Sequence, residues 1–165
     1  QNQAKIKISD SIYYKARENR SRELARKKVQ FFDKSNLLYS LEDDFSPSSV
    51  SVNQIEELIL SSGTAEFVAT GSDPFLNFPA LSEPAAEIEI YLQVNLPEAS
   101  QLEVFYATRA QPDYSQSMKV AENGSRGSNE FVIRISNASP ITRLRLDPGA
   151  VPGNYRIERL EVRSN

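Results

Sequence analysis

The strongest constraint on this chain is an alternation of apolar and polar residues that recurs along most of its length. The run EIEIYLQVNL at 87–96 has an apolar side chain at almost every second position. Successive side chains of a β-strand point to opposite faces, so this period predicts strands with one buried face. Similar runs, bounded by Pro, Gly, Asn or Ser, are QLEVFYATRA at 101–110, SMKVAE at 117–122, EFVIRIS at 130–136, ITRLRLD at 141–147 and NYRIERLEVR at 154–163.

Shorter runs lie upstream. IEELILSS at 55–62 and AEFVATG at 65–71 indicate two strands that turn at Ser61-Ser62-Gly63, although IEELIL could also begin a helix. FLNFPAL at 75–81 adds a short strand after Asp73-Pro74. Eight or nine short strands without a long helix between them predict an all-β fold, an antiparallel β-sandwich or jelly roll, over residues 37–165.

The alternation also predicts which side chains are buried. Leu144 and Leu146 should point inward, and Arg143 and Arg145 outward. A slip of the period near Arg159 indicates a β-bulge. Further inward positions are expected at Ile88, Ile90, Leu92, Val94, Ile157, Leu160 and Val162.

The first 36 residues differ from the rest. Residues 1–30 hold nine Lys or Arg against three Asp or Glu, whereas residues 31–165 hold ten against nineteen. The segment 9–32 contains no Pro or Gly and predicts a charged helix capped by Ser9 or Asp10. This helix either packs on the domain as a solvated element or forms a stalk from a membrane anchor or a preceding domain. Its basic charge would attract anionic lipid, while the acidic remainder argues against nucleic-acid binding.

Several kinds of chemistry are excluded by composition. The chain has no Cys and no His, which rules out disulfides, thiolate or imidazole metal sites and a Ser-His-Asp triad. A pair of carboxylates could still serve a glycosidase, but nothing selects one pair among 22 acidic residues. We therefore expect no enzymatic activity and no catalytic residue. The chain begins with Gln rather than Met, so we expect a longer polypeptide or an anchor before Gln1.

The segment DPGAVPG at 147–153 forms a corner between the last two strands. We expect Asp147 to accept backbone N–H bonds across this turn, and Gly149 to hold a backbone conformation closed to other residues.

The segments LRLDPGAVPGNYRIERLEV, GSDPFLNFPAL and LEVFYATRAQPDYSQS resemble galactose-binding-like jelly rolls, the fold of many carbohydrate-binding modules. The resemblance covers roughly residues 37–165 and includes modules attached to bacterial glycosyltransferases and surface-polysaccharide proteins. It implies a non-catalytic carbohydrate-binding or accessory module. The alternative is a structural or interaction ectodomain of a membrane-anchored protein, without a sugar ligand. An extracytoplasmic or membrane-associated location is expected, or a cytoplasmic one within a glycosyltransferase.

A sugar site needs aromatic faces and a few polar groups. The expected ligand-binding residues are Tyr106, Arg109, Asp113, Tyr114 and Phe75. In the alternative interpretation Phe105 belongs to the core, and the tyrosines are ordinary surface residues.

The acidic cluster at 42–44 offers oxygen ligands of the kind that calcium prefers. The resemblance implies a structural calcium near the first and last strands, with Asp43, Asp44 and Glu161 as its ligands. The other interpretation is a solvated acidic turn, and no other cofactor is expected.

Overall fold

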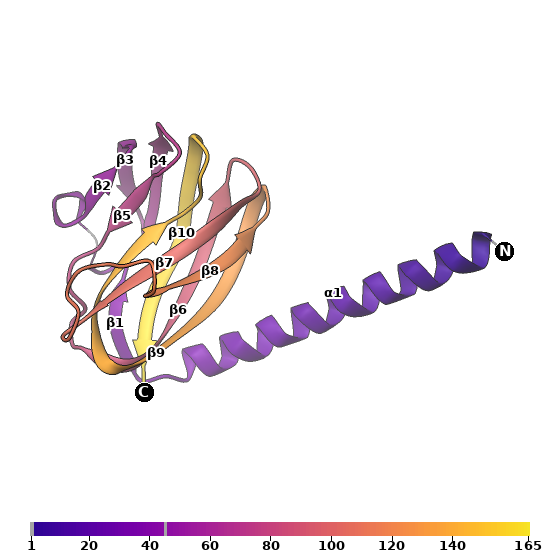
Figure 1. Ribbon diagram of the computed structural model, residues 1–165, viewed down its shortest axis with the longest axis horizontal. Coiled ribbons are helices and arrows are strands. Elements are labelled where there is room, and N and C mark those ends of the chain that lie inside the picture. Colours follow the sequence, from indigo (N-terminus) through magenta and orange to yellow (C-terminus); the bar gives the residue numbers. More distant parts are fainter. Residues whose placement is uncertain (1, 45) are drawn as a thin grey trace.

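The computed structural model describes residues 2–44 and 46–165, and the side chains of 11–44, 46 and 48–165. One helix precedes ten strands, so the predicted all-β sandwich behind a charged helix is confirmed (Figure 1). The elements are α1 (Asn2–Phe32), β1 (Asn36–Ser40), a 3-10 turn (Pro47–Ser49), β2 (Ser51–Asn53), β3 (Ile55–Ser61), β4 (Thr64–Ala69), β5 (Phe75–Asn77), β6 (Ala85–Leu96), β7 (Ser100–Thr108), β8 (Lys119–Gly124), β9 (Gly127–Asp147) and β10 (Gly153–Ser164).

The strands form two antiparallel layers. In the first layer β10 pairs with β6 on one side and with β4 and β1 on the other, β3 extends it beyond β4, and β6 pairs with residues 127–136 of β9. In the second layer residues 141–147 of β9 lie between β5 and β7, with β2 and β8 at the edges. The segment IEELIL is a strand, β3, and not a helix start.

Strand β9 belongs to both layers. The runs EFVIRIS and ITRLRLD were expected as separate strands, but they form one strand of 21 residues. Its partner changes from β6 to β7 across 137–140, where Asn137 Oδ1 accepts the Ser139 amide and Pro140 removes a backbone donor. The chain therefore bends there from one layer to the other without ending the strand.

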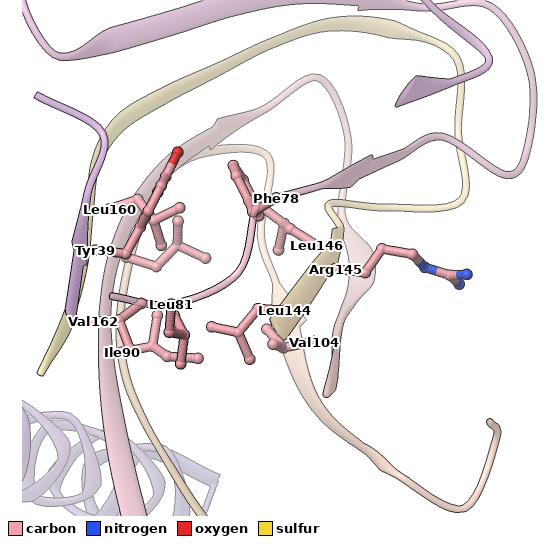
Figure 2. A pocket seen from close by; sticks show the side chains of 11 residues that line it. Tyr39, Phe78, Leu81, Ile90, Val104, Leu144, Arg145, Leu146, Leu160 and Val162 are labelled. Atoms are coloured by element: carbon pink, nitrogen blue, oxygen red, sulfur yellow. The ribbon is translucent and has the colours of Figure 1, made fainter. Parts of the chain in front are cut away.

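The core fills the space between the layers. Leu144 and Leu146 point toward Ile90 and Leu160 around an apolar cavity of about 20 Å³, while Arg145 points away from it (Figure 2). All the predicted inward positions are at most 5% exposed, and the expected bulge near Arg159 is present as a register shift after Ile157.

Helix α1 begins at Asn2, earlier than the predicted cap at Ser9 or Asp10. Residues 11–23 are exposed, and the helix extends away from the sandwich (Figure 1). Among the described side chains of the helix, those at its C-terminal end are packed: Phe31 is fully buried, and its ring centre lies 5.7 Å from that of Tyr91 on the outer face of the first layer. None of the described helix has the length and apolar character needed to cross a membrane.

Polar contacts hold the same helix end. The Glu130 carboxylate accepts hydrogen bonds from Tyr91, from Lys28 Nζ at 3.0 Å and from Gln93 at 3.1 Å. Burial raises the pKa of Glu130, but these bonds outweigh it and leave that pKa below its usual value. The C-terminal end of α1 therefore covers part of the outer face of the first layer.

At the corner, the expected backbone conformation of Gly149 and the expected hydrogen-bond partners of Asp147 are both wrong. Gly149 does not have a positive φ, whereas Gly153 does, at +138°. Gly149 is required by close approach, because an added Cβ would lie 2.7 Å from the Tyr155 hydroxyl, which donates to the Val151 carbonyl at 2.7 Å. The Asp147 carboxylate binds the Arg145 guanidinium rather than backbone amides of the turn.

We predict that Gly149→Ala lowers the free energy of unfolding by about 1–3 kcal/mol, because the methyl group displaces the Tyr155 hydroxyl from Val151. In a Tyr155→Phe background the same substitution should have a smaller effect, since the oxygen it meets is absent. Denaturant melts of the four proteins measure both effects, and full additivity would contradict the close approach as the cause.

We also predict that Phe31→Ala lowers the free energy of unfolding by about 3 kcal/mol, because it empties the contact with Tyr91. The control is Val29→Ala on the same helix, where the side chain is 64% exposed and the change should stay within about 0.5 kcal/mol. Equal melts for the two variants would show that the helix end contributes nothing to the stability of the domain.

Candidate functional site

The candidate site is the outer face of the second layer. Along residues 141–147 of β9, Leu144 and Leu146 face the core, so Arg143, Arg145 and Asp147 face outward, as the alternation predicted for the two arginines. Arg145 is seen in Figure 2 turning away from the cavity. The neighbouring strands add Phe75 and Asn77 from β5, Glu103 and Phe105 from β7, and Lys119 from β8.

Arg145 lies at the centre of this face, between two aromatic rings. Its guanidinium carbon is 4.2 Å from the ring centre of Phe75 and 4.2 Å from that of Phe105. The Tyr114 ring, from the loop between β7 and β8, is 5.6 Å away. Guanidinium groups are attracted to aromatic faces at these distances, so the cation and the rings form one unit.

Asp147 completes this unit. Its two carboxylate oxygens accept from Nε and Nη2 of Arg145, each at 2.9 Å. Burial raises the pKa of Asp147, and the Arg145 charge opposes that effect without cancelling it. The bidentate pair fixes the plane of the guanidinium between the rings.

Tyr114 is fixed by a different strand. Its hydroxyl donates to Asn77 Oδ1 at 2.7 Å. Burial raises the pKa of Tyr114 above its usual value, although the charges of Arg143 and Arg145 act in the opposite direction. The loop side chain is therefore held against the face as a neutral hydrogen-bond donor.

Glu103 and Asp147 stand opposite each other in the pairing of β7 with β9. Two neighbouring carboxylates are the arrangement that a glycosidase would need. Here Glu103 is paired with Lys119 and Asp147 with Arg145. Each carboxylate is therefore held by its own cation as part of the architecture of the face.

The structure separates the residues predicted to bind a ligand. Phe75 and Tyr114 come together around Arg145, but Tyr106 packs against the interior cluster. Arg109 and Asp113 are exposed, and among the described residues their side chains make no hydrogen bond or ion pair.

The alternative interpretation placed Phe105 in the core and Tyr106 on the surface, and the structure shows the opposite orientation for these two neighbours on β7. Phe105 lies beneath Arg145 on the outer face, and Tyr106 stands opposite Leu144 on the inner one. Sequence reasoning did not identify Arg145 as the centre of this face. The signal that could have identified it was the predicted outward orientation of its side chain.

The acidic residues expected to hold calcium do not fit the ion. Both Glu161 oxygens accept from arginines, Oε2 from Arg159 at 2.7 Å and Oε1 from Arg163 at 3.1 Å. Asp44 accepts the Ser40 amide at 2.9 Å, and Asp43 is exposed. Two guanidinium groups beside the carboxylate would repel a cation, and the described residues form no group of three or more metal-binding side chains.

Solved structures share this fold at low sequence identity. The second N-terminal cellulose-binding domain of β-1,4-glucanase C from Cellulomonas fimi is 12% identical, covers 81% of this chain and 96% of that one, and has a TM-score of 0.53. A carbohydrate-binding module of family 4 is 10% identical over 82% and 97% of the two chains, with a TM-score of 0.56. The C-terminal family 6 module of LamC, a marine laminarinase from Zobellia galactanivorans, is 10% identical over 78% and 100%, with a TM-score of 0.50.

At these identities the likeness shows the fold. The resemblance to carbohydrate-binding modules that the sequence indicated is confirmed at that level. No family model matches the chain, and no curated protein matches its sequence.

We predict that Arg145→Lys lowers the free energy of unfolding by about 1–3 kcal/mol, because an ammonium group replaces neither the stacking between the rings nor the bidentate bond to Asp147. Arg143→Lys is the matched control on the same face: this side chain is exposed, so the change should stay within about 0.5 kcal/mol. Equal losses in thermal or denaturant melts would contradict a special role for the stacked guanidinium.

Proposed function

We propose that this chain is a non-catalytic carbohydrate-binding module whose ligand lies on the outer face of the second layer. The observation that carries the proposal is the group of Phe75, Tyr114 and Arg145 on a rigid sheet. Aromatic side chains next to a few fixed polar groups are the usual composition of a sugar site. The names of the structurally similar domains, which include cellulose-binding and carbohydrate-binding modules, support it.

The position of α1 supports the choice of face. The helix end packs on β6 and β9 of the first layer through Phe31 and Lys28, and Lys34, just after the helix, pairs with Glu89 of β6. A chain-like ligand would compete with this contact there. On the second layer the exposed Arg143 and the half-buried Tyr114 lie where no part of the described helix packs, so a ligand can reach them.

We further propose that the module is an accessory part of a larger, surface-polysaccharide protein, in an extracytoplasmic or membrane-associated location with α1 as a stalk. The support is the exposure of residues 11–23 on a basic helix that leaves the domain. The alternative, a structural ectodomain without a sugar ligand, is favoured by the exposed Ile12, Tyr13 and Tyr14 on the same helix.

The test is a titration with a panel of neutral and acidic oligosaccharides, followed by backbone NMR shifts. We expect weak binding, with shifts concentrated on Phe75, Tyr114 and Arg145. Tyr114→Ala should weaken the affinity by about tenfold, since one aromatic contact is worth about 0.5–1.5 kcal/mol beyond its burial. Tyr13→Ala on the helix should leave the affinity unchanged.

The native spectrum of each variant serves as the check of folding. Shifts confined to α1 and β6 would place the ligand elsewhere. The absence of shifts with every sugar at millimolar concentration, together with an oligomer in solution, would support the structural alternative.

A further inference from the structure

The two phenyl rings of the candidate face, Phe75 and Phe105, are not free to stack on a sugar. Phe105 is 3% exposed, and its ring faces the guanidinium of Arg145. The same group covers the Phe75 ring at an equal distance. A neutral pyranose gains affinity mainly by laying its apolar side on an open ring, so the filled rings favour a ligand recognised by other means.

The face also offers more hydrogen-bond donors than acceptors. Both carboxylate oxygens of Asp147 accept from Arg145, and one oxygen of Glu103 is ion-paired with Lys119. Asn77 accepts from Tyr114 with its side-chain oxygen, which leaves the amide nitrogen of Asn77 as a donor. A ligand rich in acceptors therefore matches this surface better than one rich in hydroxyl donors.

Arg143 supplies the charge for such a ligand. It lies two residues before Arg145 on the same face and is exposed. Among the residues that the structure describes, it makes no ion pair, whereas Arg145 and Lys119 are each neutralised. Burial keeps the pKa of the Tyr114 hydroxyl above its usual value, and the charges of Arg143 and Arg145 oppose that effect only in part.

We propose that the ligand of this face is an anionic sugar, whose carboxylate or sulfate is held by the Arg143 guanidinium beside Tyr114. This rests on the proposed carbohydrate-binding function and names the class of ligand. A guanidinium binds either group through two parallel N–H bonds. The Asn77 amide and the Lys119 ammonium then lie on the same face for the remaining ring oxygens.

The net negative charge of the sandwich opposes the attraction between Arg143 and an anionic sugar only weakly. At physiological ionic strength the field of an exposed charge is screened over about 8 Å. Two carboxylates on the face, Asp147 and Glu103, are paired with cations. Binding should therefore depend on Arg143 rather than on the net charge of the protein.

The experiment compares oligogalacturonate with its methyl ester, and a sulfated galactan oligosaccharide with its desulfated form, by calorimetry and NMR on the full chain. We expect at least one acidic oligosaccharide to bind about tenfold more tightly than its neutral partner, with affinity falling as salt is added. The pair that shows the difference distinguishes a uronate from a sulfate.

Arg143→Gln should abolish that difference. The matched control is Arg156→Gln, an exposed arginine of β10 in the first layer, which changes the net charge equally and should preserve it. Equal losses in the two variants would show that only net charge matters and would overturn the Arg143 site.

Equal affinity for each acidic oligosaccharide and its neutral partner would overturn the anionic ligand but leave carbohydrate binding standing. No binding to any member of the panel, neutral or acidic, would overturn both.

Discussion

The candidate face depends on the fact that one strand, β9, serves both layers of the sandwich. Its first half pairs with β6, and after the bend at 137–140 its second half pairs with β5 and β7. The alternation continues through 141–147, so Leu144 and Leu146 are fixed in the core and Arg145 between them must point out. The position of the guanidinium is thus a consequence of packing on the opposite side of the strand.

The two outer faces of the sandwich have different neighbours. On the first layer α1 places Phe31 against Tyr91 and Lys28 beside Glu130, and Lys34, just after the helix, pairs with Glu89. On the second layer the contacts are made among the face's own residues and a side chain of the loop between β7 and β8. The helix therefore covers part of one outer face and leaves the other available for recognition.

Sequence reasoning predicted the strands, the inward leucines and the outward arginines, because all of these follow from a period of two. It did not predict that 130–136 and 141–147 form one strand, since a bend between layers leaves no periodic signal. It also assigned the neighbouring Phe105 and Tyr106 to the wrong sides in one interpretation. Both are aromatic, and only the pairing with Arg145 and Leu144 decides which ring is outside. Asp147 was interpreted as a turn residue. Its actual partner, Arg145, lies two positions earlier, and residues at this spacing share a face only when both belong to a strand.

The filled rings limit what the fold alone can indicate about the ligand. Domains with the same sandwich are named for carbohydrate binding, but here the two phenyl rings are occupied by a side chain of the protein itself. Arg145, at 19% exposure, requires Asp147 and the rings to offset its loss of hydration. Arg145, Asp147 and the two phenyl rings therefore have a structural role, and the positive and negative charges of this group cancel. The groups that remain for a ligand are those around it that the fold does not use, and Arg143 is a charged group among them. Recognition on this face is therefore expected to depend on charge at its edge rather than on stacking at its centre.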